Sequence, residues 1–274
     1  MCVMGFLWWV LWPELICAQL WLPGRIAPPF SFPLITGNAD VFSRSVFPSF
    51  AALDNDFRAG LFIDKPLQVK NVRSAGAALL VPFKSMVFFS GIMDAGNKDF
   101  HQSTYSIGLA KKAGELCIGS RAFYFSQSTR GYGSTGNFSM EVNILFPMVK
   151  DIFFFADVAG IGSTVQNEKA GLPVSYSMGI IYKVSEEVEA GGIWKKIKGI
   201  PSWMEVQLYY RPLKQCSIQA SFISHIQSLN LAISYRLSFF SLSAAIRYQQ
   251  VFGPMATTAL SYHGIPNGST VQSP

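Results

Sequence analysis

The chain has 274 residues, of which 50% are hydrophobic, 14% are aromatic and 14% are charged, and its formal net charge is +6. This composition is too apolar for a disordered protein and low in charge for a soluble one, and its many Phe, Tyr, Ser and Gly residues favour strands over helices. The basic residues are scattered over segment ends and turns, without the basic stripe and interleaved aromatics of a nucleic-acid-binding surface. We therefore expect no nucleic-acid partner.

Residues 1–18 predict a secretory signal peptide. The stretch 6–17 is apolar but too short to cross a bilayer as a helix, and Ile16-Cys17-Ala18 is a small-residue cleavage site. The first basic residue is Arg25, so the usual basic start of such a signal is missing, and a lipoprotein signal with a lipidated Cys17 is the weaker alternative. No later stretch is long and apolar enough for a transmembrane helix, so residence in a membrane would have to come from strands.

Residues 19–56 form a segment rich in Pro and Phe with little periodicity. Prolines at this density preclude a regular helix or a central strand. Two interpretations remain open, an irregular lead-in and a plug that enters the lumen of a barrel. The prolines of this segment are Pro23, Pro28, Pro29, Pro33 and Pro48.

Residues 57–263 alternate between apolar and polar side chains, as strands do. Between 203 and 211, for example, Met204, Val206 and Leu208 share one face, while Glu205 and Gln207 share the other. The same period of two runs through 138–146, 229–236 and 240–249. Tyrosines stand near the predicted strand ends, as an interfacial girdle requires; they are Tyr182, Tyr210, Tyr235, Tyr248 and Tyr262.

The spacing of turns divides this region into about 14 strands, an even number that suits an up-and-down barrel. Short turns near 83–85, 111–115, 147–150, 184–186, 212–214 and 237–238 alternate with longer connections near 64–74, 94–102, 126–136, 159–172, 194–201, 224–227 and 249–253. Lipid cannot hydrogen-bond an exposed peptide group, so a sheet in a bilayer must close on itself. We predict an all-β, closed antiparallel transmembrane barrel with short periplasmic turns, followed by a polar tail at 264–274. A secreted β-sandwich adhesin is the alternative, because sandwich strands alternate too.

Four motifs carry a resemblance to a known family. They are Phe47-Pro48-Ser49-Phe50-Ala51-Ala52-Leu53, the hairpin entry 105–112, Gly131-Tyr132-Gly133-Ser134, and 199–203 before 208–212. With them the chain resembles the FadL-like outer-membrane barrels, and among these the PorV/PorQ-like branch of Bacteroidota. The resemblance implies a barrel in the bacterial outer membrane with a lumenal N-terminal segment.

The same resemblance implies a non-enzymatic function, either transport of small hydrophobic molecules or an accessory part in type IX protein secretion. The implied partners are outer-membrane lipid and lipopolysaccharide, together with secretion-complex proteins or a hydrophobic small molecule. From the alternation, the polar residues that we expect to face the lumen are Glu141, Asn143, Glu205, Gln207, Arg236 and Arg247. They either contact a passing molecule or fill the lumen with a hydrogen-bonded network.

His101 and Ser103 suggest an alternative, an outer-membrane lipid hydrolase, because residues two apart on a strand face the same side. The Asn-Gly that follows the serine in such enzymes is replaced here by Thr104-Tyr105. The catalytic interpretation is therefore the less favoured one.

No cofactor or metal site is predicted. Cys117 and Cys216 have neither the spacing nor the neighbouring histidines of a zinc site. The acidic residues Glu186, Glu187 and Glu189 make a thin metal site and are better explained as part of a solvated periplasmic rim.

Overall fold

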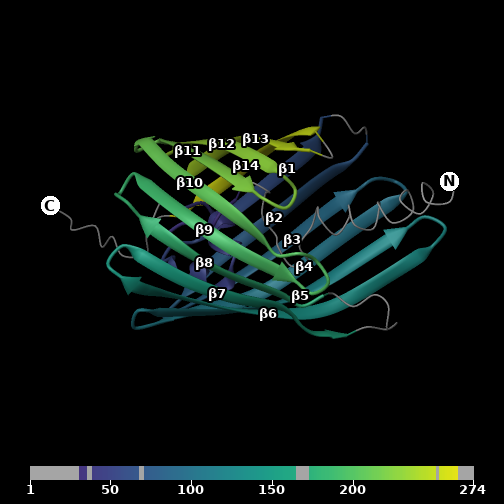
Figure 1. Cartoon of the computed structure of the whole chain (residues 1–274), viewed down its shortest axis with the longest axis horizontal. Coiled ribbons are helices and arrows are strands. Elements are labelled where there is room, and N and C mark those ends of the chain that lie inside the picture. Colours follow the sequence, from purple (N-terminus) through teal and green to yellow (C-terminus); the bar gives the residue numbers. More distant parts are fainter. Residues whose placement is uncertain (1–30, 36–38, 68–70, 165–172, 251–252, 265–274) are drawn as a thin grey trace.

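The computed structural model describes residues 31–35, 39–67, 71–164, 173–250 and 253–264. Within them, fourteen antiparallel strands form one closed barrel, in which every strand pairs with its chain neighbours and β1 pairs with β14 (Figure 1). This confirms the predicted fold class and excludes the sandwich, because a sandwich consists of two open sheets. The strands are β1 (Arg58–Pro66), β2 (Arg73–Phe83), β3 (Met86–Gly96), β4 (Phe100–Ala113), β5 (Leu116–Thr129), β6 (Gly133–Val149), β7 (Ile152–Thr164), β8 (Ser175–Lys183), β9 (Val188–Ile197), β10 (Trp203–Leu213), β11 (Cys216–Ile223), β12 (Ser228–Leu237), β13 (Phe240–Gln249) and β14 (Gly253–His263).

The alternation in the sequence becomes the two faces of the barrel wall. On β10, Val206 and Leu208 are exposed on the outside, whereas Glu205 and Gln207 are buried inside. The same pattern holds on β12 and β13. Successive side chains of a strand point to opposite faces of the sheet. The pairing register therefore determines which side chains face outward and which face the lumen.

The outer surface is apolar and carries tyrosines at two levels. Between these levels the exposed side chains are Leu, Ile, Val, Met and Phe, as on a wall that faces hydrocarbon. Near the end of the barrel that holds the short turns, which we call the turn rim, the tyrosines are Tyr182, Tyr210, Tyr235 and Tyr262. Near the opposite end, which we call the loop rim, they are Tyr105, Tyr124, Tyr176 and Tyr248.

The turns at the turn rim are tight, and the strands at the loop rim are longer than predicted. Gly114 has a positive φ of +62° in the two-residue turn between β4 and β5, a conformation that such hairpins require. In the range 126–136, which was predicted as a loop, only Arg130–Tyr132 lie outside strands, and β6 is 17 residues long. Pairing continues past the apolar band because polar and Gly-rich residues can remain in the ladder where water replaces lipid.

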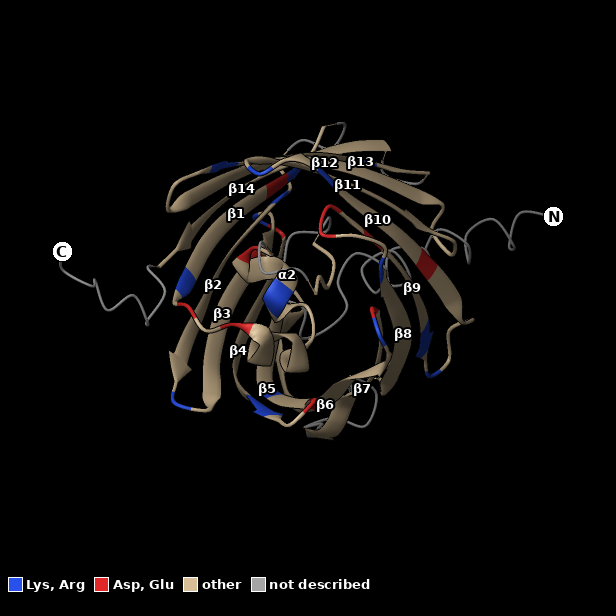
Figure 2. Ribbon diagram, turned by 90° about the vertical axis from the view of Figure 1, so that its left-hand side faces the viewer, with Lys and Arg blue, Asp and Glu red and all other residues tan. Residues whose placement is uncertain are grey.

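The described residues of the N-terminal segment, 31–35 and 39–57, lie inside the ring of strands and include two short helices (Figure 2). The first, α2 (Val41–Ser45), is capped by Asp40, whose Oδ1 accepts a hydrogen bond from the Ser43 amide at 2.7 Å. The second, η1 (Pro48–Leu53), starts with Pro48, which a first helical position tolerates because that amide has no helical partner. The prolines therefore do not preclude short helical stretches here, although the described part of the segment holds no longer helix. In the described part of the chain, no helix is long and apolar enough to cross a membrane.

The predicted signal peptide at 1–18 lies outside the described residues, as does all but the first residue of the predicted tail at 264–274. The predicted domain limits 19–56 and 57–263 also stay a prediction, because residues 19–30 lie outside the described residues. What the structure describes of these two parts is the segment up to Phe57 and the barrel that starts at Arg58.

The outer wall yields a test with a matched pair of variants on β12. Leu231 and Leu237 are similarly exposed, at 57% and 58%, but Leu231 lies between the tyrosine levels and Leu237 lies at the turn rim. We expect Leu231→Arg to cost roughly 2–4 kcal/mol of folding free energy in a bilayer and Leu237→Arg about 0–1 kcal/mol. Urea titration of the protein folded into lipid vesicles measures both values. Equal costs at the two positions would contradict a lipid-facing wall.

Candidate functional site in the barrel lumen

The N-terminal segment packs against an apolar part of the inner wall. Phe42 of α2 meets Phe62 of β1 edge-on, with ring centroids 5.5 Å apart. Phe47 and Phe50 both contact Phe155 of β7, with centroids 4.8 and 5.4 Å away. Such aromatic pairs add to the free energy that burial of their surface already provides. One continuous apolar cluster thus joins the segment to the wall, mainly over β1–β9.

Buried charges hold the end of the segment that leads into the barrel. Asp54 lies 2.6 Å from the Arg58 guanidinium and 3.4 Å from that of Arg44. Arg44 also donates to the Leu34 carbonyl at 2.6 Å, and Arg58 donates to the Ala39 carbonyl. Charges in a water-poor interior are stable only when paired and hydrogen-bonded. This network therefore ties three parts of the segment to the first residue of β1.

The opposite side of the segment is held by polar groups of β5 and β6. Ser49 donates to the side-chain oxygen of Asn143 through its hydroxyl and, at 3.2 Å, through its amide. Arg121 donates to the Ser45 carbonyl at 3.0 Å and is paired with Glu141. These contacts satisfy backbone groups that the short helices leave without partners.

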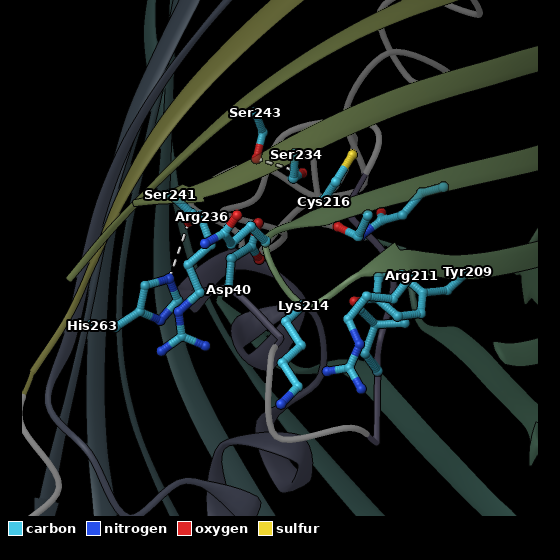
Figure 3. Close-up of a pocket in the computed structure, with 14 residues that line it drawn as sticks. Asp40, Tyr209, Arg211, Lys214, Cys216, Ser234, Arg236, Ser241, Ser243 and His263 are labelled. Carbon is cyan, nitrogen blue, oxygen red and sulfur yellow. Dashed lines mark hydrogen bonds between the residues drawn. The ribbon is translucent and has the colours of Figure 1, made fainter. Parts of the chain in front are cut away.

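Among the described residues, one small cavity lies along the segment near the turn rim and another lies toward the loop rim. The cavity near the turn rim has a volume of about 40 Å³ and is lined by Asp40 and by basic residues of the wall, among them Arg211, Lys214 and Arg236 (Figure 3). The cavity toward the loop rim is also about 40 Å³ and is lined by Phe47 together with charged residues of β5–β9. A space of this size holds a few water molecules and no larger solute. Passage of an organic molecule through either cavity therefore requires movement of the segment.

The six polar residues predicted to face the lumen all lie on the inner face of the wall. Asn143 and Gln207 contact the N-terminal segment directly, Gln207 by donating to the Pro33 carbonyl at 3.3 Å. Glu141 accepts from Arg121, and Glu205 accepts from Lys195 at 2.6 Å, so both are paired within the wall. Arg247 lies 3.5 Å from Asp64, and Arg236 lines the turn-rim cavity. A role for these residues in contacting a passing molecule stays a prediction.

Sequence reasoning missed several charged residues of the lumen. These are Arg44, Asp54, Arg58, Arg121, Asp157 and Lys195. On β5 and β7 the inward positions mix charge with large apolar groups, as with Arg121 beside Phe123 and Asp157 beside Phe155. A rule that sorts polar residues inward and apolar residues outward finds no clear phase in such strands. The neighbouring strand β6 alternates clearly, and its inward-facing Glu141 pairs with Arg121. That pairing could have assigned Arg121 to the inner face.

The acidic residues predicted at a periplasmic rim divide between two environments. Glu186 and Glu187 are exposed in the turn between β8 and β9, whereas Glu189 is buried on the inner wall and accepts from the Ile35 amide at 3.0 Å. The hydrogen bond from Lys183, at 2.5 Å, holds the pKa of Glu186 below its usual range. No group of three or more potential ligands for a metal ion occurs among the residues that the structure describes.

His101 and Ser103 lie on the outer face of β4, not in the lumen, next to Asp94 of β3. Ser103 Oγ is 2.8 Å from Asp94 Oδ1 and 3.1 Å from His101 Nε2, and the same histidine nitrogen is 3.0 Å from Asp94 Oδ1. A catalytic triad needs one imidazole nitrogen for the serine and the other for the carboxylate. Here one nitrogen faces both partners, so the serine hydroxyl and the imidazole compete for one carboxylate oxygen instead of forming a relay.

Comparison with known proteins identifies a set of similar barrels. Neither a family model nor a curated protein matches the sequence. Among solved structures, the toluene transporter TodX of Pseudomonas putida is similar with a TM-score of 0.62 and 10% identity, over 89% of this chain and 97% of that one. The toluene transporter TbuX of Ralstonia pickettii has a TM-score of 0.64 and 10% identity, over 88% and 98% of the two chains. The CymD monoaromatic hydrocarbon channel has a TM-score of 0.59 and 11% identity, over 90% and 96%. The protein thus has the fold of these hydrocarbon channels.

The fit of the segment in the barrel can be tested at Gly119 of β5. A Cβ at this position would lie 2.3 Å from the carbonyl carbon of Pro48 and 2.4 Å from the Ser49 amide nitrogen, whereas a Cβ at Gly192 of β9 would have no neighbour within 4 Å. We expect Gly119→Ala to disfavour the seated segment by roughly 1–3 kcal/mol, because the contact is with backbone that cannot give way. Conductance in planar bilayers should rise for Gly119→Ala and stay at the parent value for Gly192→Ala. Unchanged conductance in both variants would show that the segment does not limit the lumen.

Proposed function

We propose that the protein is a FadL-like channel of the bacterial outer membrane that passes small hydrophobic molecules, and that its N-terminal segment is a movable plug. The observation that carries this proposal is the apolar inner wall beneath α2 and η1. Phe62, Phe89 and Phe155 are buried there on lumen-facing positions of three different strands. Displacement of the segment would leave an apolar surface inside the barrel, suited to a hydrophobic solute.

A water-filled pore does not fit this inner wall. Channels for hydrophilic solutes have polar interiors, since water must wet the full path. In this protein the large inward-facing apolar side chains form one cluster, supplied mainly by β1–β9, whereas Ser, Asn, Gln and Thr face inward on β11–β14. The cluster also has charged neighbours on the inner wall of β5–β9, which are Arg121, Glu141, Asp157, Glu189 and Lys195. A hydrophobic molecule can lie against the apolar cluster while water remains at the polar and charged positions.

The fold supports the same class of function. TodX, TbuX and CymD are hydrocarbon transporters or channels, and this chain covers most of each with the same barrel. The apolar outer wall with two tyrosine levels supports a place in a bilayer, and the outer membrane is where bacterial barrels of this kind reside. The PorV/PorQ-like branch and an accessory role in type IX secretion stay predictions from the sequence alone.

Lipid hydrolysis is the less supported function. The Ser103 hydroxyl contacts the Asp94 carboxylate directly. The same imidazole nitrogen of His101 contacts both the serine and the aspartate, so the second nitrogen is not used as a triad requires. We therefore propose a non-enzymatic protein.

The plug can be locked by a disulfide between α2 and β1. Val41 Cγ1, the position that a cysteine sulfur would take, lies 2.5 Å from the site of a Cβ at Gly60, and two ring atoms of Phe42 lie 2.9 Å from that site. A disulfide between these positions therefore forms only when the end of the Phe42 side chain shifts, which is less costly than the backbone contact at Gly119. In a chain whose four native cysteines are serines, we expect oxidised Val41→Cys/Gly60→Cys to lose most uptake of radiolabelled toluene by cells that carry it in their outer membrane. Reduction should restore the uptake, because the bond alone holds the segment in place.

The control for the lock is the single Val41→Cys variant, whose uptake should not depend on oxidation. Heat-modifiable migration on a gel establishes that each variant is a folded barrel. Equal uptake by the oxidised and reduced double variant would show that solutes pass without movement of α2. Absence of uptake in every state, including the parent chain, would end the proposal of hydrocarbon transport.

The non-enzymatic part of the proposal has its own test. We expect the purified protein to release no fatty acid from mixed phospholipid micelles, and the Ser103→Ala variant to behave identically, because the serine hydroxyl and one imidazole nitrogen both contact a single carboxylate oxygen of Asp94 and form no relay. Release of fatty acid that disappears in Ser103→Ala would establish the hydrolase instead.

A further inference from the structure

A large groove on the outside of the barrel is not used by the proposed channel. It lies at the loop rim over β1–β4 and has a volume of about 880 Å³. We call it the rim groove; it is lined by Ile63, Lys65, Asn71, Val72, Arg73, Asp94, Gly96, Asn97, Lys98, Asp99 and His101. This groove is far larger than either cavity in the lumen, so it can hold a sizeable ligand without any change in the barrel.

The charges of the rim groove leave a surplus of cations. Lys65, Arg73 and Lys98 are exposed, and none of them has an ion pair within the described residues. Both acids of the groove already have partners. Asp94 accepts from Ser103 at 2.8 Å and lies beside His101, and Asp99 lies 3.5 Å from Arg130. With Arg130, which is paired with Asp99, four basic groups stand against the two carboxylates Asp94 and Asp99. The groove thus keeps a surplus of two positive charges, an arrangement that attracts an anion.

The depth of the groove follows from the strand register. Ile92 of β3 pairs with Tyr105 of β4, and Tyr105 pairs with Tyr124 of β5, so these residues mark the tyrosine level near the loop rim. Asp94 is two residues beyond Ile92 toward the loop rim, roughly 7 Å farther along the strand. Tyrosines of such a level sit among lipid headgroups. The basic residues of the rim groove are therefore at the height of the headgroups and just above them.

The lower edge of the groove is apolar. Ile63 lines it, and Leu61, two residues farther toward the turn rim, is exposed on the same outer face of β1. An occupant that fits has an acyl chain along this edge and an anionic head against the three cations. Both parts belong to one membrane lipid.

We propose that the rim groove binds the phosphorylated headgroup of a lipopolysaccharide through Lys65, Arg73 and Lys98. This rests on the proposed place in the outer membrane, with the loop rim facing the cell exterior, where lipopolysaccharide forms the outer leaflet. A phospholipid headgroup carries one phosphate and fits a groove of this size and charge less well. The bound lipid would connect Arg73, at the start of β2, to Lys98, between β3 and β4.

The test compares three folded proteins in detergent micelles. They are the parent chain, the triple variant Lys65→Gln/Arg73→Gln/Lys98→Gln, and a control triple variant at the turn rim, Lys111→Gln/Lys112→Gln/Lys150→Gln, which removes the same charge. Titration with purified lipopolysaccharide, followed by the fluorescence of a label on the lipid, measures the affinity of each. We expect a loss on the order of 100-fold for the rim-groove variant, since each basic group near a charged membrane surface contributes about fivefold and the three factors multiply. The control should bind like the parent chain.

Chemically altered probes identify the part of the lipid that is recognised. Dephosphorylated lipopolysaccharide should bind the parent chain as weakly as the intact lipid binds the rim-groove variant. Equal affinity of the parent and the rim-groove variant, or an equal loss in the control, would overturn the proposal. So would binding of phosphatidylglycerol vesicles or inorganic phosphate as tight as that of lipopolysaccharide, because the site would then recognise any phosphate.

The result does not depend on transport. The titration uses no hydrocarbon and leaves the plug untouched, so failure of the uptake experiment would not change the expected affinities. Cell fractionation tests the shared assumption separately. A chain absent from the outer membrane would remove the lipid from its surroundings and with it both proposals.

Discussion

The whole structure depends on the need of peptide groups for hydrogen-bond partners in a solvent that offers none. Hydrocarbon leaves each exposed N–H or C=O without a partner, and a sheet can satisfy all of its groups only when its last strand pairs with its first. In this chain that closing pair is β1 with β14, from Arg58 opposite His263 to Pro66 opposite Met255. Closure then creates an interior that the chain must fill, which a flat sheet would not require.

The N-terminal segment fills that interior with two different kinds of contact. On the side of β1–β9 it buries rings against rings, as between Phe47 and Phe155, and this contact is not directional. Elsewhere it uses directed bonds, of which Ser49 to Asn143 and Asp54 to Arg58 are examples. The first kind gives a surface that an apolar solute can occupy in place of the segment. The second kind fixes one seated position, because each bond has one geometry.

The sequence predicted the barrel well because apolar and polar residues alternate with a period of two along most strands. Glu205 and Gln207 alternate with Val206 and Leu208, and the burial of these side chains follows the pattern. Strand ends at the loop rim were predicted too early, since polar residues such as Ser128 still pair beyond the apolar band. Most lumenal contacts could not be predicted, because they join residues far apart in the sequence, such as Ser49 with Asn143, and no local pattern signals such a pair. The ion pair of Asp54 with Arg58, four residues apart, is a local contact that the sequence reasoning overlooked.

The way in which the segment joins the barrel limits how it can move. Residues 54–57 connect η1 directly to the start of β1, and Gly264, just after β14, donates to the Phe57 carbonyl at 2.7 Å at the turn rim. The segment is therefore fixed at one end to the closing seam of the barrel, and any displacement pivots about these few residues. A solute that wedges between Phe50 and the wall would act at a distance from this pivot. In mechanical terms, the arrangement favours opening from within the barrel.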